Sequence, residues 1–258
     1  MADLHRISTL FGLTDRVAIV TGGTRGIGRA IAEGFVDAGA SVVVASRKQA
    51  AVHETVEALR ARGGRAIGRA THLGEPDDID QLVAQTVSEF GRIDVIVNNA
   101  ATALSEPVGS FTAAVWTKVF DVDARGPVFL VQAALPQLIA SPSASVINVI
   151  SAGAFISAPN AAMYSAAKAA LLSLTRTMAQ EFAPKGIRVN ALAPGPVDTA
   201  MTRATGPEGM ERMQAAVWQK RIAPPEEMVG PALFLASDAS SFVTGQVVIA
   251  DGGLVTAR

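Results

Sequence analysis

The chain has 258 residues, and 49% of them are hydrophobic, which is enough to bury a large sheet in one core. Its 22 Lys and Arg residues nearly balance its 23 Asp and Glu residues, and a net charge of −1 gives no reason to expect a nucleic acid or a membrane as a partner. The absence of cysteine excludes disulfides and thiolate metal sites, and the scattered His5, His53 and His72 predict no metal site. Residues 1–15 lack a signal-peptide core and no apolar run could cross a bilayer, which favours a cytoplasmic protein.

The chain then shows the order strand, glycine-rich loop and helix. Residues 16–20 are apolar and predict a short strand, which runs into the loop at residues 21–28 and then into a helical pattern over 29–38. This order is that of the first part of a βαβ unit.

Three glycines in this loop have separate physical roles. Gly22 can take the tight turn, Gly26 lets the backbone approach a pyrophosphate, and Gly28 allows close packing of the helix. The N-terminus of the helix would then face the phosphates of a dinucleotide. The loop residues expected to bind this cofactor are Gly22, Thr24, Arg25, Gly26, Ile27 and Gly28.

The end of the second predicted strand, residues 41–45, indicates which dinucleotide is bound. An acidic residue there would bind a free ribose 2′-hydroxyl, but this chain has Ser46 followed by Arg47. A guanidinium pairs well with a phosphate, and Arg25 could join it, which favours NADP(H) while NAD(H) stays possible. The alternative is that Arg47 is only a surface residue at the start of the next helix.

Strand-like and helix-like segments alternate along the rest of the chain. Further strands are expected at residues 65–70, 93–97, 146–150, 187–192 and 246–250, and helices at 49–62, 76–90, 112–138 (bent near Gly126 and Pro127), 164–183 and 225–237. This alternation predicts an α/β fold, a single-domain Rossmann fold over residues 1–258 with a doubly wound parallel sheet of about seven strands and helices on both faces. Residues 1–14 would be an N-terminal extension. Residues 197–222, which show no clean period beyond residue 200, would hold a substrate lid or only a variable surface loop.

The reactive centre is expected at Ser151, Tyr164 and Lys168. Tyr164 is the only tyrosine of the chain, and on a helix it shares a face with Lys168. A nearby ammonium favours the phenolate form, so this phenol could exchange a proton with a carbonyl or alcohol oxygen at neutral pH. Ser151 follows a predicted strand and could donate to the same oxygen. The alternative is an amphipathic helix in which the two side chains are incidental.

Four motifs now occur in one order. They are Thr21-Gly-x-x-x-Gly-x-Gly28, Asn98-Asn-Ala100, Ser151 with Tyr164-x-x-x-Lys168, and Pro194-Gly195 leading to Thr199. Together they resemble the short-chain dehydrogenase/reductase family over essentially the whole chain. The segments Ser46-Arg-Lys-Gln49 and Asn99-Ala-Ala101 are also similar to its NADPH-dependent carbonyl reductases.

The resemblance implies a mechanism in which hydride passes between the nicotinamide and a carbonyl carbon. Tyr164 would be the acid/base, Lys168 would bind the nicotinamide ribose, and Ser151 would orient the substrate oxygen. The Val197 backbone would hold the carboxamide and Thr199 the phosphate region. The remaining cofactor-binding residues that it implies are Asn99, Ala100 and Ala101 on the adenosine side, and Pro194 and Gly195 before Val197.

Two residues depart from the family pattern. Asp123 stands where the family usually has an asparagine that helps hold a water of the proton relay. An aspartate could still accept a hydrogen bond from this water and take part in catalysis, but it would add a negative charge near Lys168. His72, followed by Leu73, stands where the family usually has an aspartate that contacts adenine. A neutral imidazole could still hydrogen-bond the amino group.

The sequence therefore favours an NADP(H)-dependent carbonyl reductase or secondary-alcohol dehydrogenase with a small-molecule substrate. Alternatives are an NAD-dependent alcohol dehydrogenase, a non-catalytic or regulatory nucleotide-binding protein, and an isomerase or dehydratase. The residues that could line an apolar substrate pocket, or belong to the core, are Ala152, Phe155, Met163, Met201 and Trp218. The resemblance also implies a homotetramer or homodimer paired through the helices that hold Ala113–Leu138 and Tyr164–Ala183.

Overall fold

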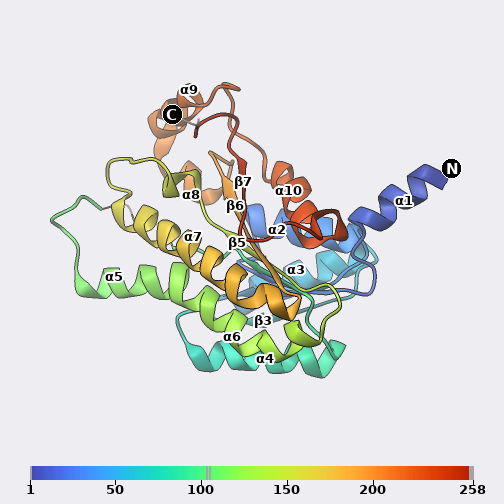
Figure 1. Ribbon diagram of the computed structural model, residues 1–258. Helices are drawn as coiled ribbons and strands as arrows, with labels where there is room; N and C mark the ends of the chain where they lie inside the picture. Colours follow the sequence, from blue (N-terminus) through green and yellow to red (C-terminus); the bar gives the residue numbers. More distant parts are fainter. Residues whose placement is uncertain (1, 103, 105, 256–258) are drawn as a thin grey trace.

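Seven parallel strands form one sheet in the computed structural model, which describes residues 2–102, 104 and 106–255. The strand order is β3-β2-β1-β4-β5-β6-β7, so the sheet grows outward in both directions from β1 and β4 (Figure 1). The strands are β1 (Val17–Thr21), β2 (Ser41–Ser46), β3 (Ala66–Ala70), β4 (Val95–Asn98), β5 (Ser145–Val149), β6 (Arg188–Pro194) and β7 (Val247–Ala250). This order confirms the predicted doubly wound α/β fold.

The central strands β1, β4 and β5 are buried along their whole length because helices cover both faces of the sheet. All five residues of β1 are buried, and their side chains alternate between the two faces. Ala18 and Val20 belong to the core on one face of the sheet, whereas Val17 and Ile19 belong to the core on the other face.

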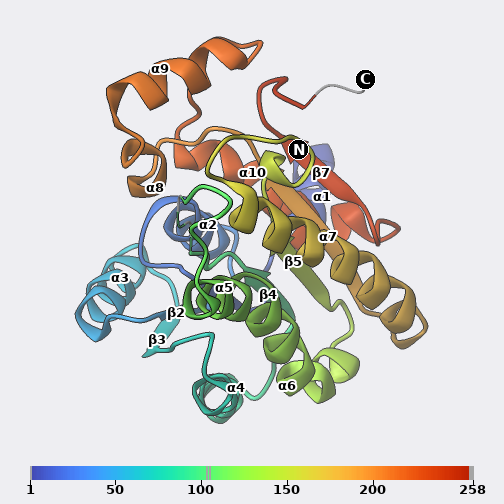
Figure 2. The same cartoon turned by 90° about the vertical axis from the view of Figure 1, so that its left-hand side faces the viewer.

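Two helical layers enclose this sheet. Figures 1 and 2 show α2, α3 and α10 along one face and α4, α6 and α7 along the other. The helices are α1 (Ala2–Phe11), α2 (Gly26–Asp37), α3 (Gln49–Ala61), α4 (Pro76–Phe90), α5 (Ala113–Phe120), α6 (Gly126–Ala140), α7 (Ala162–Phe182), α8 (Ala200–Arg203), α9 (Gly206–Ala216) and α10 (Val229–Ala236). None of the helices in the described part of the chain is long and apolar enough to span a membrane.

The predicted bend in the long helix is a π-helical turn, Asp121–Arg125, between α5 and α6. Pro127 explains its position, because a proline lacks an N–H donor and its ring crowds the carbonyl four residues earlier, which belongs to Asp123. Gly126 also packs closely here, since a Cβ on it would lie 2.5 Å from Leu73 O. The widened turn therefore starts before Gly126 and Pro127, and it carries Asp123 inward.

Three other segments differ from the sequence expectation. Residues 2–11, which were expected only as an N-terminal extension, form α1. Residues 200–216, where the sequence shows no clean period, contain α8 and α9. In α9 the one buried residue is Gly209, so the helix lacks the apolar stripe by which a helix is recognised in a sequence. The last predicted helix is split into a 3-10 turn, Pro225–Met228, and α10.

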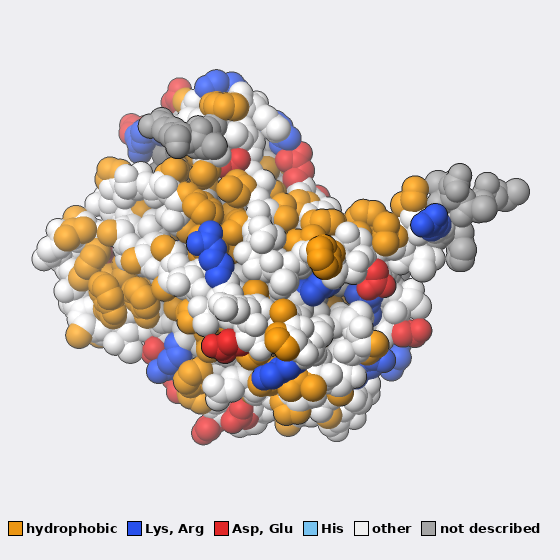
Figure 3. All heavy atoms as spheres, viewed as in Figure 1, with side chains coloured by type: hydrophobic (Ala, Val, Ile, Leu, Met, Phe, Trp, Pro, Cys, Tyr) orange, Lys and Arg blue, Asp and Glu red, His pale blue; other side chains and the backbone are white. Residues whose placement is uncertain are grey.

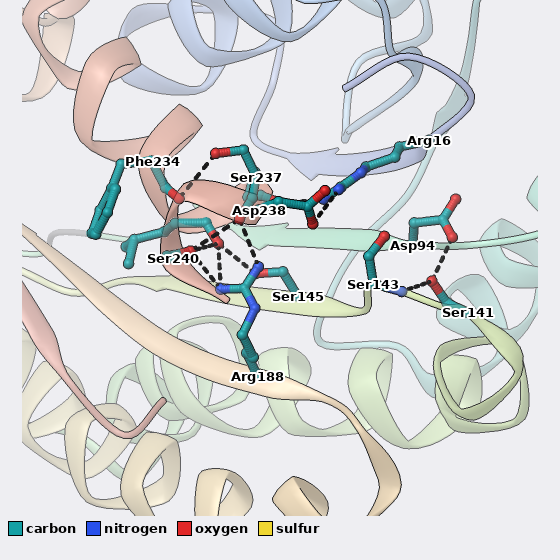
Figure 4. A network of polar contacts seen from close by, with 12 residues as sticks. Arg16, Asp94, Ser141, Ser143, Ser145, Arg188, Phe234, Ser237, Asp238 and Ser240 are labelled. Carbon is teal, nitrogen blue, oxygen red and sulfur yellow. Dashed lines mark hydrogen bonds and ion pairs between the residues drawn. The ribbon is translucent and has the colours of Figure 1, made fainter. Parts of the chain in front are cut away.

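A polar network closes the edge of the sheet at which the strands begin (Figure 4). The Arg188 guanidinium donates to Leu235 O at 2.9 Å and to Ser240 Oγ at 2.6 Å, and Arg16 pairs with Asp238 at 2.6 Å. Burial lowers the pKa of Arg188 to about 10, so the side chain remains a cation at neutral pH. These bonds tie β1 and β6 to the end of α10 and leave the opposite edge to form the site.

Candidate functional site

The predicted site residues meet at the carboxyl edge of the sheet. All seven strands are parallel, so the loops that follow them share one edge, and a crevice is expected where the order reverses between β1 and β4. The carboxyl ends of β1, β2, β3, β4, β5 and β6, with the segments that follow them, hold residues 22–28, 46–47, 72–73, 99–101, 151 and 194–199, respectively. The fold thus brings together residues from six separate parts of the sequence.

The glycine loop needs glycine for two different reasons. Gly22 and Gly26 have φ values of 63° and 53°, a left-handed conformation that disfavours other residues. A Cβ on Gly28 would overlap Asn99 Nδ2 and Gly22 O, so here close packing forbids a side chain. Since α2 begins at Gly26, its free N–H groups open toward the crevice and suit a phosphate.

Two arginines at the corner between the glycine loop and β2 have no side-chain partner in the described part of the chain. Thr24 Oγ1 donates to Ser46 Oγ at 3.0 Å and ties the loop to the end of β2. Arg25 and Arg47 are exposed, and within the described part of the chain neither guanidinium makes a hydrogen bond or an ion pair. Both cations are therefore available to a phosphate at this corner.

His72 and Leu73 present different groups at the end of β3. Gly74 N donates to His72 Nδ1 at 3.1 Å, so the neutral imidazole carries its proton on Nε2. The free nitrogen of His72 is then a donor, which suits a ring nitrogen of adenine rather than the amino group. The Leu73 side chain is buried in the core, which leaves only its backbone for a ligand.

The two asparagines at the carboxyl end of β4 connect neighbouring strands by hydrogen bonds. Asn98 Nδ2 donates to Asn148 Oδ1 at 2.8 Å and joins β4 to β5, and Asn99 Nδ2 donates to Thr21 O at 2.9 Å. The backbone N–H groups of Asn99 and Ala100 both donate to Thr21 Oγ1. Ala100 and Ala101 remain partly exposed at the crevice.

The segment after β6 reaches from β7 to the glycine loop. A Cβ on Gly195 would lie 2.6 Å from Asp251 Cα. Only a glycine therefore fits where this segment passes the residue that follows β7. Thr199 caps α8 by accepting from Thr202 N, and its methyl carbon lies 3.1 Å from where a Cβ on Gly26 would be. Thr199 therefore borders the glycine loop, and its contact with a phosphate stays a prediction.

Val197 keeps a backbone donor free in this segment. Its bridge to Ala223 uses the carbonyl of Pro196 and the N–H of Asp198, at 3.0 and 2.8 Å. Among the described residues Val197 N has no hydrogen-bond partner, while the side chain of Val197 is buried. A carboxamide could accept from this N–H.

Tyr164 and Lys168 lie one turn apart at the start of α7. Lys168 Nζ is 5.7 Å from the centroid of the tyrosine ring, and it donates to Val149 O of β5 at 3.1 Å. Ser151 follows the same strand, and its Oγ accepts from Gly153 N at 3.0 Å, which leaves its own proton free to donate. The two elements thus place a hydroxyl, a phenol and an ammonium at one end of the crevice.

Asp123 completes this group from the π-helical turn. Its Oδ2 lies 3.6 Å from Lys168 Nζ, and its Oδ1 accepts from Thr102 N at 2.7 Å. The carboxyl is fully buried, and burial raises the pKa of Asp123 against the opposing effect of Lys168. In the described structure Oδ2 makes no hydrogen bond, so Lys168 is the group that offsets its charge.

The residues expected around a substrate divide into two groups. Phe155, Met201 and Trp218 are exposed, whereas Ala152 and Met163 are buried in the core. A pocket of about 370 Å³ lies between residues 217–223 and the loop after β7, and one of about 350 Å³ lies between residues 153–158 and α7. Neither pocket is lined by Tyr164 or Ser151, so neither contains the reactive group.

Some groups that build the site gave no signal in the sequence. The backbone atoms Thr102 N and Val149 O orient Asp123 and Lys168, and a backbone partner cannot be recognised from residue type. The hydroxyl of Thr21 holds two N–H groups after β4, and its place at the head of the glycine motif was the one available clue.

Comparisons with known proteins show which sequences and structures the chain resembles. The sequence model of a family described as enoyl-(acyl carrier protein) reductase matches residues 22–255. The chain is 38% identical over 244 residues to the human dehydrogenase/reductase SDR family member 4, covering 93% of this chain and 88% of that protein. It is also 38% identical over 240 residues to the cis-4-hydroxycyclohexanecarboxylate dehydrogenase of Sinomonas cyclohexanicum, covering 93% of this chain and 96% of that one.

Solved structures are similar over nearly the whole chain. One is the crystal structure of a 3-oxoacyl (acyl-carrier-protein) reductase from Agrobacterium tumefaciens C58 with NADP bound, with a TM-score of 0.90 and 35% sequence identity. The similarity covers 96% of this chain and 97% of that one.

Proposed function

Since the chain belongs to the short-chain dehydrogenase/reductase family and is an NAD(P)-dependent oxidoreductase of CH–OH groups, we propose that it interconverts a ketone and a secondary alcohol with NADP(H), using Tyr164 as acid/base. The observation that carries this proposal is the placement of Tyr164 beside the buried Lys168 at the carboxyl edge of the sheet. A phenol next to an ammonium is suited to proton exchange with an alcohol oxygen.

The side chains of the site divide the work of the reaction. A bound nicotinamide supplies the acceptor or donor of the hydride. In oxidation, Tyr164 takes the hydroxyl proton as the carbinol carbon loses its hydride, and in reduction it returns that proton to the carbonyl oxygen. Ser151 donates its free hydroxyl proton to the same oxygen and holds it near the phenol.

The residues at the other end of the crevice fit an NADP(H) molecule. The glycine loop has no side chains at Gly22 and Gly28, where a Cβ would overlap neighbouring atoms, so its backbone can come close to a cofactor. Among the described residues Val197 N has no hydrogen-bond partner and could donate to a carboxamide. Arg25 and Arg47 are exposed and unpaired in the described structure, which supports a 2′-phosphate as their ligand. The similar reductase with NADP bound supports the same choice.

The substrate that we propose is a small carbonyl compound or alcohol with an apolar body. Phe155, Met201 and Trp218 leave exposed apolar surface on the loops that follow β5 and β6. Residues 197–222, which hold α8, α9 and Trp218, would then form the substrate loop. The relative named for a hydroxycyclohexanecarboxylate supports a ring-bearing alcohol as one starting point for a screen.

The chain is also proposed to form a homodimer or homotetramer through α5, α6 and α7. Figure 3 shows hydrophobic side chains gathered over α5 on the left of the molecule. Trp116 is exposed there and stacks on Phe120 with ring centroids 4.8 Å apart, and Phe129 on α6 is exposed as well. Exposed apolar surface of this kind is typical of a protein interface.

Replacement of Tyr164 tests the proposed chemistry. We expect Tyr164→Phe to lower the rate of ketone reduction by about 10²- to 10⁴-fold, because the proton donor is lost. NADPH binding, measured by cofactor fluorescence, should persist. Thr177→Ala on the exposed face of α7 is the matched control and should keep its rate. Full activity of Tyr164→Phe would disprove the role of the phenol.

A further inference from the structure

The ammonium beside Tyr164 is paired with a carboxylate. Lys168 Nζ and Asp123 Oδ2 are 3.6 Å apart, and 1% and 0% of these residues are exposed. Among the described residues, the hydrogen bonds of the pair go to backbone, from Thr102 N to Asp123 and from Lys168 to Val149 O. Water therefore screens their attraction only weakly.

The other ionisable groups near this pair are few. On α7, Arg176 and Glu181 are exposed, as is Lys118 on α5, and α6 has no ionisable side chain. In the π-helical turn itself, Arg125 pairs with Asp121 at 3.2 Å. The charge beside the phenol is accordingly set by Lys168 and Asp123.

The protonation state of Asp123 determines the net charge of the ion pair beside Tyr164. When the carboxyl is ionised, the pair has no net charge, and the phenolate gains little from it. When the carboxyl is protonated or replaced by an amide, the uncompensated ammonium favours the phenolate. Burial raises the pKa of Asp123, so the change between these two states falls at a higher pH than for an exposed aspartate.

We propose that Asp123 is a positioning residue that offsets the charge of Lys168 beside Tyr164 and thereby shifts the pH dependence of the reaction to more alkaline pH. This inference rests on the proposed function of Tyr164 as acid/base. It predicts a difference in the pH dependence of alcohol oxidation, which needs the phenolate. The rate of oxidation should begin to rise at a higher pH in this chain than in a variant without the carboxylate.

The composition of the chain allows a direct measurement. Tyr164 is the only tyrosine, so the near-ultraviolet absorbance of phenolate reports this one group in the intact protein without cofactor or substrate. We expect Asp123→Asn to lower the midpoint of the titration by on the order of one pH unit. Asp123→Glu, which keeps the charge, should retain a midpoint near that of the parent chain. Asp123→Ser gives a second neutral variant if the amide disturbs folding.

Control variants separate charge from structural damage. Asp121→Asn removes a carboxylate from the same turn but one that pairs with Arg125, and its midpoint should equal that of the parent. Tyr164→Phe should abolish the signal, and circular dichroism at each pH identifies unfolding.

Two outcomes overturn the inference. One is an unchanged or higher midpoint in both Asp123→Asn and Asp123→Ser, which would mean that Asp123 is already protonated. The other is an equal shift in Asp121→Asn. Either result leaves the proposed function intact, because that proposal fails only if Tyr164→Phe keeps its turnover.

Discussion

Within the residues that the structure describes, Arg25 and Arg47 lack the ion pairs that several other arginines make. Arg29 pairs with Glu33 at 2.9 Å and Arg92 with Asp94 at 2.7 Å, and each of these pairs serves the structure. An exposed guanidinium without a carboxylate keeps its five donors for a ligand. For these two residues, position after β1 and β2 and freedom from partners both favour phosphate binding.

Reversal of the charge at Arg47 should change the choice of cofactor. We expect Arg47→Asp to lower kcat/KM for NADPH relative to NADH by roughly 10- to 100-fold, since a charge-assisted hydrogen bond contributes about 1.5–3 kcal/mol. Steady-state kinetics with each nicotinamide measures the ratio. Arg65→Asp is the control, because Arg65 is also exposed but precedes β3 at the opposite edge of the sheet. An equal effect of both variants would show that net charge, rather than Arg47, sets the preference.

Residue type alone could not assign every side chain of the site. Tyr164 and Lys168 were predicted from their spacing on a helix, and the structure places them one turn apart. The acceptor role of His72 Nδ1 depends on the turn that brings Gly74 N to it, which no pattern shows. Met163 has the same apolar character as Met201, yet one is buried and the other exposed.

Elements with a buried face were the most predictable parts of the fold. All seven strands appear within a few residues of their predicted positions. The buried central strands are the clearest of them because they are mostly apolar, whereas the edge strands β3 and β7 are only partly buried. The boundaries of α2 were less certain, since it begins at Gly26 inside the glycine motif rather than after it. Exposed α9 was not predicted, and the π-helical turn depends on the crowding by Pro127, which the sequence located only as a bend.

The junction of β1, the glycine loop and α2 has no room for one more carbon atom. We expect Gly28→Ala to lower the free energy of unfolding by about 1–3 kcal/mol and to weaken NADPH binding, because the added Cβ overlaps Asn99 and the backbone of Gly22. Denaturant unfolding and cofactor titration measure the two effects.

The matched control for this change is another glycine near the start of a helix. Gly230 in α10 has open space around the position of a Cβ, so Gly230→Ala should leave cofactor binding unchanged and should not destabilise the fold. If Gly28→Ala behaved like Gly230→Ala, close packing would not be the reason for glycine at position 28.

The two edges of the sheet have different tasks in the whole molecule. At the amino edge, Arg16 and Arg188 are satisfied by the end of α10, so their charges are used within the fold. At the carboxyl edge, Val197 N and the arginines after β1 and β2 remain without partners among the described residues. Stability and ligand binding are thus separated along the strands, which lets the loops vary without loss of the sheet.

The apolar face of α5 and α6 leads to a prediction about assembly. We expect Trp116→Glu to shift the protein toward a smaller species, since a carboxylate buried in an interface has no partner there to offset its desolvation. Sedimentation velocity over a range of concentrations measures the mass. Trp218→Glu is the control, because Trp218 is 71% exposed on the loop after α9, away from the proposed interface. If the mass of Trp116→Glu equals that of the parent and of Trp218→Glu, the chain does not pair through this face.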